Sequence, residues 1–339
     1  MKPLRILALM HDYLVPPDDI DGIDVINVPW KMEFDVVSHL EDMGHLVHKV
    51  GVKDDLSVIR QGIVDGRPDI VFNLMESFGE VGVYDQHVVS FLELMRTPYT
   101  GCNPRGLLLS RDKALARSLL AYHRVPVPEF FVARRGRRPR RPKRLAFPLI
   151  VKSLTQEGSI GTSQASVVED DGALAERVGF VHRSVGTDAI VERYVDGREL
   201  YVGVLGNSRL RVLPVWEMNF AQMPERAYRI ASERVKWNDA YREKYGITTE
   251  PAALPADVAH RIRHLCTRAY RALGLSGYAR IDLRLDAEGR AFVLEANPNP
   301  QLAYGEDFAE SAEHAGIQYE ELLRRIIRLG LQWQPQEAG

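Results

Sequence analysis

The residues best suited to chemistry lie in segment 280–300, RIDLRLDAEGRAFVLEANPNP. Residues 279–285 and 291–296 alternate polar and apolar side chains on either side of the sequence DAEG. Alternation with a period of two, interrupted by a short turn, is typical of two paired antiparallel strands. The segment therefore predicts a β-hairpin.

Three oxygen-bearing side chains of this hairpin are expected on one face. If the turn centres on Ala287 and Glu288, Asp282 and Glu295 lie nearly opposite each other, and Asn297 projects from the same face as Glu295. Two facing carboxylates repel each other, so the arrangement favours a bound cation. Oxygen ligands without Cys or His favour Mg²⁺ or Mn²⁺ over zinc. The alternative is a solvent-facing hairpin with ordinary surface acids, which the apolar run beside Glu295 disfavours.

Arg280 lies two residues before Asp282 and is expected on the same face of the hairpin. Its guanidinium could bind a carboxylate through two hydrogen bonds, or neutralise a developing oxyanion or phosphoryl charge. The alternative is a salt bridge to Asp282 or Glu295, and both interpretations can hold together.

Lys152 closes the apolar strand FPLIVKS and precedes the loop LTQEGSIGTS, which has glycines at 158 and 161. The lysine ammonium suits a phosphate group, and the glycines allow backbone N–H groups to approach phosphate oxygens. No GK[ST] follows the glycines, so this is not a Walker A loop. An ordinary hairpin loop is the alternative interpretation.

Segment 189–200, AIVERYVDGREL, is a further candidate for nucleotide binding. An apolar strand leads into Glu192, Tyr194 and Val195, and Glu199 follows the DGR turn. The backbone N–H and C=O groups of a strand edge can bind adenine, and an acidic residue after a turn can bind a ribose diol. The alternative is an edge strand that carries surface charges.

These candidates need a scaffold, and the first hundred residues alternate strands with helices. Strands are predicted over 4–10, 45–52 and 69–75, and helices over 35–45, 55–66 and 83–96. This rhythm indicates a parallel sheet with helices on its faces. A further helix is predicted over 106–122.

From residue 147 the pattern indicates antiparallel strands. The strand-like segments are FPLIVKS, QASVVE, DAIVERYV, RELYVGVLG and RLRVLPVWEM. Helices are predicted near 171–184, 255–273 and 318–330. The long polar stretch 219–250 is predicted to be a mobile loop or lid.

Composition limits the class of protein. The chain has 339 residues, 45% of them hydrophobic and 27% charged, which is typical of a globular protein with two or three domains. A net charge of −2 gives no general attraction to nucleic acid or anionic membranes. The two cysteines, Cys102 and Cys266, lie far apart in sequence and fit a reducing cytosol. Since neither a signal peptide nor a membrane-spanning run is recognised, a soluble cytoplasmic protein of enzyme size is expected.

Residues 134–144, RRGRRPRRPKR, contain eight basic side chains in eleven positions. One interpretation is a patch for nucleic acid or an acidic partner. The favoured interpretation is a solvated loop between the strand-like segments VPEFFVA and FPLIVKS, because no aromatic residues are interleaved. Nucleic-acid binding is therefore not expected to be the main function.

Taken together, these segments resemble the ATP-grasp superfamily and, within it, the D-alanine–D-alanine ligase family. The matching segments occur in the family's order and run from residue 69 to about 302: FNLMES, TPYTGCNPRGLLLSRDKALAR, VPVPEF, FPLIVKS with EGSIGTS, AIVERYVDGRELYVGVLG, GYARIDLRLD and VLEANPNPQL. The resemblance implies an ATP-grasp fold of class α/β with α+β lobes. It places an N-terminal parallel-sheet domain at 1–110, a small central ATP-binding lobe at 111–205 and a C-terminal antiparallel-sheet catalytic lobe at 206–339.

The resemblance also implies roles for individual residues. The residues implied to contact the nucleotide are Lys113, Lys152, Ser159, Gly161, Glu192, Tyr194, Val195, Glu199 and Lys236. Among these, Ser159 and Gly161 belong to the loop that closes over the phosphates, and Lys236 to a mobile loop that reaches ATP in the closed state. Asp282, Glu295 and Asn297 are implied to hold two Mg²⁺ ions. Arg280, Ser159 and Lys236 are implied to be catalytic.

The implied reaction joins a carboxylate to an amine at the expense of ATP, through an acyl phosphate protected from water. An ATP-grasp kinase and a non-catalytic ATP-binding module are the alternatives. The family also suggests a homodimer formed through the N-terminal lobe.

The departures from the family lie at the end where the substrates bind. The family's acidic residue after the first strand has Asp12 as its candidate counterpart, and its Leu-His-Gly is Leu74-Met75-Glu76 here. Its serine pair in the glycine loop is reduced to Gly158–Ser159, and its small-residue turn after the metal-binding asparagine becomes PNPQLAYGEDF. Nucleotide and metal residues are retained while the amino-acid pocket differs, so ATP-dependent ligation is expected more firmly than D-alanine as the substrate.

Overall fold

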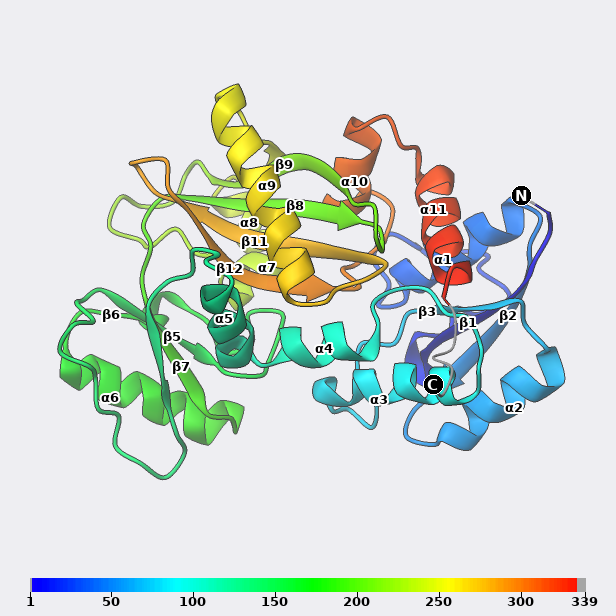
Figure 1. The fold of residues 1–339 in the computed structure, drawn as a ribbon, viewed down its shortest axis with the longest axis horizontal. Coiled ribbons are helices and arrows are strands. Elements are labelled where there is room, and N and C mark those ends of the chain that lie inside the picture. Colours follow the sequence, from blue (N-terminus) through cyan, green and yellow to red (C-terminus); the bar gives the residue numbers. More distant parts are fainter. Residues whose placement is uncertain (1, 334–339) are drawn as a thin grey trace.

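Three β-sheets organise the chain, and the computed structural model describes residues 2–333 of it (Figure 1). The strands are β1 Arg5–His11, β2 Leu46–Val52, β3 Ile70–Asn73, β4 Phe130–Ala133, β5 Leu149–Ser153, β6 Val167–Val168, β7 Ala189–Arg193, β8 Arg198–Leu205, β9 Arg211–Phe220, β10 Ile247–Pro251, β11 Tyr278–Leu285 and β12 Ala291–Pro298. The α-helices are α1 Lys31–Asp42, α2 Leu56–Gly66, α3 Asp85–Leu94, α4 Pro104–Arg111, α5 Lys113–Tyr122, α6 Asp171–Phe180, α7 Glu233–Trp237, α8 Asp239–Lys244, α9 Ala256–Ala272, α10 Asp307–His314 and α11 Tyr319–Leu331.

The N-terminal sheet is parallel, with strand order β2-β1-β3, and confirms the predicted alternation of strands and helices. Its central strand β1 is apolar and almost fully buried, as expected for a strand with neighbours on both edges. The C-terminal helix α11 packs on β3 and α1, and its Ile326 and Ile327 share a core with Ile6 and Phe72. The two ends of the chain therefore stabilise one lobe together (Figure 1).

The predicted helix over 106–122 is wrong in one respect, because the structure breaks it into α4 and α5 at Asp112. This residue has extended backbone angles (φ −89°, ψ 104°), and its carboxylate accepts hydrogen bonds from the N–H groups of Ala114 and Leu115, each at 2.9 Å. An aspartate that caps a helix in this way stabilises a new N-terminus. As a result, Lys113 begins α5.

The central sheet is antiparallel, with strand order β4-β7-β5-β6, and α6 covers one of its faces. The strand predicted from QASVVE is shorter than expected, because only Val167 and Val168 pair with β5. Buried aliphatic side chains of β5, β7 and α6 form a small core of their own. This lobe can therefore present the loop between β5 and β6 to the rest of the molecule.

The C-terminal sheet is antiparallel, with strand order β10-β9-β8-β11-β12, and α9 packs on it. The stretch 219–250, predicted to be a mobile loop or lid, is not an irregular loop, since it contains α7, α8 and β10. Strand β10 pairs with β9, and Val235 and Ile247 are buried against Trp216 and Phe220. A few apolar side chains spaced along a polar segment are enough to order it.

The hairpin of β11 and β12 confirms the prediction from the sequence. Asp282 pairs directly with Glu295, and Arg280 pairs with Asn297. Leu283 pairs with Val293, so a β-bulge leaves one extra residue on β12. The bulge shifts the register by one residue, and this shift places Glu295 opposite Asp282.

Within residues 2–333, no helix is both long enough and apolar enough to span a membrane.

Candidate active site

A cleft of about 760 Å³ lies between the central sheet and the β11–β12 hairpin. Its walls bring together most of the residues predicted to bind nucleotide and metal. These are Lys113, Lys152, Ser159, Glu192, Tyr194, Val195, Glu199, Lys236, Asp282 and Glu295. The remaining predicted residues lie beside it: Gly161 in the loop that borders the cleft, and Arg280 and Asn297 in an adjoining cavity.

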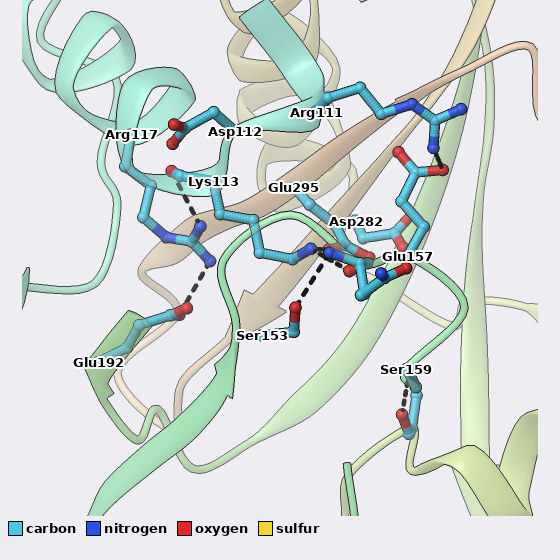
Figure 2. A network of polar contacts seen from close by, with 12 residues as sticks. Arg111, Asp112, Lys113, Arg117, Ser153, Glu157, Ser159, Glu192, Asp282 and Glu295 are labelled. Carbon is cyan, nitrogen blue, oxygen red and sulfur yellow. Dashed lines mark hydrogen bonds and ion pairs between the residues drawn. The ribbon is translucent and has the colours of Figure 1, made fainter. Parts of the chain in front are cut away.

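Lys113 is the most buried lysine of the cleft, with a side chain only 7% exposed. Its ammonium donates a hydrogen bond of 2.6 Å to the carbonyl oxygen of Gln156 and lies 3.9 Å from a carboxylate oxygen of Glu295 (Figure 2). Burial lowers the pKa of Lys113, while the neighbouring carboxylate of Glu295 opposes that shift. The helix break at Asp112 is what directs this side chain at the loop after β5.

Glu295 stays ionised in this environment. Burial alone would raise its pKa, but the ammonium groups of Lys113, Lys236 and Lys152 outweigh burial and lower the pKa to about 2. The pKa of Asp282 is raised, because burial of this 3% exposed residue outweighs the favourable charge of Arg280. The facing carboxylates of Asp282 and Glu295 therefore repel each other, and added positive charge would reduce this repulsion.

Arg280 forms the salt bridge that the sequence left open as an alternative. Its guanidinium donates to both oxygens of Asp282, at 2.7 and 3.0 Å, and lies over the ring of Tyr201 at 4.8 Å. Burial opposes the charged form of Arg280, yet the carboxylate of Asp282 prevails and raises its pKa. The arginine thus remains a fixed positive charge at the border between the cleft and the adjoining cavity.

The oxygen donors of the hairpin fit a hard divalent cation. Glu295 and Asp282 offer carboxylate oxygens from paired positions, and Asn297 adds an amide oxygen from the next residue on the same face of β12. The side-chain nitrogen of Asn297 is buried and has no hydrogen-bond partner within residues 2–333. These donors suit Mg²⁺ or Mn²⁺ and are too hard for zinc.

The predicted adenine site lies at the end of β7. Glu192 is fully buried, and one of its carboxylate oxygens accepts a hydrogen bond of 2.9 Å from Arg117. Its other oxygen has no partner in the part of the chain described, although the residue lines the cleft. Ile150 and Ile230 supply apolar walls. A flat ring with an exocyclic amine could pack against the apolar walls and donate a hydrogen bond to the free oxygen of Glu192.

Glu199, the predicted ribose contact, is held by Arg284. The guanidinium of Arg284 donates to a carboxylate oxygen of Glu199 at 2.7 Å, and also to the carbonyl oxygen of Gly197 at 2.8 Å. The hydroxyl of Tyr201 donates to the other oxygen of Glu199 at 3.2 Å. The carboxylate is therefore fixed in position while it faces the cleft.

The glycine loop after β5 is fastened to the segment that carries Lys236. Ser159 donates to the carbonyl oxygen of Ala231 at 2.6 Å (Figure 2). The N–H of Gly161 donates to Glu233 at 2.7 Å, and the indole N–H of Trp237 donates to the carbonyl oxygen of Gly158 at 2.8 Å. The loop reaches this geometry through positive φ angles at residues 158, 159 and 161. Both segments that the sequence predicted as lids thus meet over the cleft.

A second cavity of about 1170 Å³ adjoins the cleft and shares Glu157 and Lys236 with it. Its walls come from the N-terminal lobe, through Met75 and Glu76, and from the segment after β12. Arg280 and Asn297 lie at its inner end. The space suits molecules that react at the metal and phosphate end of the cleft.

Several important residues were missed in the sequence. Arg117 is four residues after Lys113, a spacing that puts both on one helical face and could have drawn attention to it. Arg284 could have been found by the same alternation that singled out Arg280 and Asp282.

Arg111 binds Asp85 at 2.5 Å and also pairs with Glu157, and these contacts join the N-terminal lobe to the glycine loop. No sequence signal predicts that link, because it depends on the packing of three separate segments.

The basic segment 134–144 lies away from both cavities, in the connection between β4 and β5. Arg134 pairs with Asp188 and Arg141 with Asp171, while Arg137, Arg138, Arg140, Lys143 and Arg144 are exposed. These contacts agree with the favoured interpretation of a solvated loop.

Comparison with known proteins gives consistent relatives. Residues 119–328 match the family described as "D-ala D-ala ligase C-terminus". The D-alanine–D-alanine ligase of Desulforudis audaxviator is 32% identical over 304 residues, which cover 87% of this chain and 90% of that protein. An uncharacterized protein of Sinorhizobium fredii is 34% identical over 259 residues, which cover 76% of this chain and 73% of that protein.

Solved structures share the fold over nearly the whole chain. The D-alanine–D-alanine ligase from Bacillus anthracis complexed with ATP aligns with a TM-score of 0.74 and 21% identity, covering 97% of this chain and 98% of that chain. The corresponding ligase from Coxiella burnetii aligns with a TM-score of 0.68 and 18% identity, covering 98% and 94%. The predicted fold is thereby confirmed.

Proposed function

This chain belongs to the D-alanine–D-alanine ligase family, and on that premise we propose that its cleft joins a small carboxylate to an amine at the expense of ATP. The observation that carries the proposal is the meeting of three ammonium groups with the facing Asp282 and Glu295, at the point where the two cavities join. One cavity then takes the nucleotide, and the other takes the molecules to be joined.

The reaction has two balanced steps. An oxygen of the substrate carboxylate attacks the γ-phosphorus of ATP, the bond from phosphorus to the bridging oxygen breaks, and ADP leaves. The amine nitrogen then attacks the acyl carbon, inorganic phosphate leaves with the electron pair of the carbon–oxygen bond, and the nitrogen loses a proton. An amide remains.

The nucleotide is bound from both ends of the cleft. Glu192 accepts a hydrogen bond from the adenine amine through its free oxygen, and Tyr194 and Val195 border the ring. Glu199, fixed by Arg284, accepts from the ribose hydroxyls. At the other end, the lysine ammonium groups offset the negative charge of the phosphates, which would otherwise repel the incoming carboxylate.

The hairpin acids Asp282 and Glu295, with Asn297, would hold two Mg²⁺ ions, for which Mn²⁺ could substitute. When bound there, such ions would polarise the phosphoryl group and neutralise charge that develops on it. Arg280 keeps Asp282 oriented and directs positive charge at the reacting carboxylate.

Water must be excluded, because an acyl phosphate hydrolyses readily. The three hydrogen bonds between the glycine loop and the segment of Lys236 close the cleft on its open side. Ser159 takes part in this closure directly.

The test is a phosphate-release assay with Mg²⁺ and ATP over pairs of D- and L-amino acids and small acids, with mass detection of the product. The proposal expects release that requires both a carboxylate and an amine. Release with a carboxylate or hydroxyl acceptor alone would instead identify a kinase. Binding of ATP without turnover under every mixture would identify a non-catalytic module.

Two organisational predictions accompany this function. The first is the division into functional units at residues 1–110, 111–205 and 206–339, which limited proteolysis with mass mapping tests. The second is a homodimer formed through the N-terminal lobe, which light scattering on the purified protein tests.

A further inference from the structure

The cavity beside the reaction centre has an unusual set of charges on the wall away from the nucleotide. Glu76 enters it from the N-terminal lobe, and Glu306 and Asp307 enter it from the segment that leads into α10. Because these acids face a space that must admit substrates, their charge selects what binds there.

Most other charged groups of this cavity are already paired. Asp85 and Glu157 bind Arg111, and Arg280 binds Asp282. Lys236 acts on the hairpin acids, since its charge helps to lower the pKa of Glu295. These groups therefore add little net charge at the outer wall.

The three acids of the outer wall are different. In the part of the chain that the structure describes, no ion pair and no hydrogen bond engages the side-chain carboxylate of Glu76, Glu306 or Asp307, although Arg111 donates to the backbone carbonyl oxygen of Glu76. Arg242 opposes Glu306 and forms no ion pair within the same residues, while the charges of Lys31 and Arg280 also act on Glu306. The charge of Arg111 acts on Glu76. The outer wall thus carries more negative than positive charge.

A further acid, Glu33, lies close enough to Glu76 to feel its charge. Glu33, in the first turn of α1, is 1% exposed, and one of its carboxylate oxygens has no partner within residues 2–333. Burial, together with the nearby charge of Glu76, raises the pKa of Glu33 to about 7. The same turn of α1 touches the segment before Glu306, because the ammonium of Lys31 donates to the carbonyl oxygen of Tyr304 at 2.7 Å.

We propose that the cavity takes a basic amino acid, whose second ammonium group binds at the acidic outer wall that Glu76, Glu306 and Asp307 form. The proposal rests on the ligase function above and names the substrate class of that site. A side-chain ammonium supplies three donors, and it relieves the repulsion among the carboxylates. An acidic amino acid would add to that repulsion, and an aliphatic one would leave the acids without partners.

The experiment compares matched amino acids that differ in one charge. Phosphate release with Mg²⁺ and ATP is measured with lysine and ornithine against norleucine and norvaline, which have the same carbon chains without the terminal ammonium. Each is supplied as the D and the L form, alone and together with D- or L-alanine. We expect kcat/KM to be at least about tenfold higher for the basic member of each pair, as a charge-assisted hydrogen bond provides. Equal or higher values for the neutral member would overturn the proposal.

Substitutions in the cavity wall test whether Glu76 and Glu306 cause the preference for the basic amino acid. Glu76→Gln and Glu306→Gln should each lower the preference for lysine over norleucine by about tenfold. Glu288→Gln, in the exposed hairpin turn, is the matched control and should leave the preference unchanged. A preference that survives both cavity variants would contradict the assignment.

A binding measurement separates this inference from the proposed function. Calorimetry with lysine and with norleucine is performed on the protein saturated with Mg²⁺ and adenylyl imidodiphosphate, which is not hydrolysed. Tighter binding of lysine supports the inference even if no mixture releases phosphate, a result that would refute the ligase proposal alone. Equal binding of the two amino acids overturns the inference even if the enzyme is an active ligase.

Discussion

The buried ion pair between Arg117 and Glu192 offers a sharp test of how the nucleotide cleft is built. Both side chains are 1% exposed and their charged atoms lie 2.9 Å apart. Replacing Arg117 with Met leaves the carboxylate of Glu192 buried without its partner, which costs about 3–5 kcal/mol. The hydrogen bond from Arg117 to the carbonyl oxygen of Lys113 is lost as well and adds about 1 kcal/mol. The total is a large part of the roughly 5–15 kcal/mol that stabilises a typical protein.

The assay is urea unfolding followed by circular dichroism, together with calorimetric titration of ATP. The double variant Arg117→Met, Glu192→Leu removes both charges, and its stability should return to within about 1–2 kcal/mol of the wild type. Its affinity for ATP should not return, because the free oxygen of Glu192 is gone. Arg134→Met is the control, since it breaks an exposed pair and should change stability by less than about 1 kcal/mol. A loss below about 1 kcal/mol for Arg117→Met, or a double variant as unstable as the single one, would refute this reasoning.

Four further predictions follow from the same structure. Because burial gives Glu33 a pKa of about 7 in the folded protein, the folded state binds the proton more tightly than the unfolded state. The wild type should therefore lose about 3 kcal/mol of stability as pH rises from about 4.5 to about 7, and urea unfolding of Glu33→Gln should lack that dependence. Glu295→Gln and Asp282→Asn should each lower turnover by about 100-fold or more, and excess Mg²⁺ should not restore it in the release assay. Trp237→Phe loses the bond to the carbonyl oxygen of Gly158 and should raise KM for ATP about fivefold, corresponding to about 1 kcal/mol in steady-state kinetics. Replacing Arg137, Arg138 and Arg140 with Ser should leave kcat and KM within about twofold, since exposed surface changes have small effects.

The sequence predicts the metal hairpin well because strand pairing has a strict period of two. Once Asp282 and Glu295 are placed on facing strands, their side chains share a face, and the β-bulge fixes which residues are opposite. The exact register could not be derived, since a turn centred on Ala287 and Glu288 would pair Asp282 with another residue. The bulge depends on packing that the local sequence does not encode.

Contacts between distant segments were beyond the sequence. Lys31 of α1 contacts Tyr304 in the segment before α10, although the two residues lie more than 250 positions apart in sequence. The stretch 219–250 is predicted from the sequence to be a mobile loop or lid because its polar residues outnumber the few that are buried, such as Val235 and Ile247. Burial of those few side chains against β9 orders the stretch 219–250, but its average composition does not reveal them.

The central claim is tested most directly by one measurement, phosphate release from Mg²⁺ and ATP in the presence of a carboxylate, an amine, or both, with mass detection of the product. The ligase proposal predicts release only with both, one amide formed for each phosphate, and loss of both signals in Glu295→Gln. Release that does not require the amine, or an undiminished rate in Glu295→Gln, would contradict it.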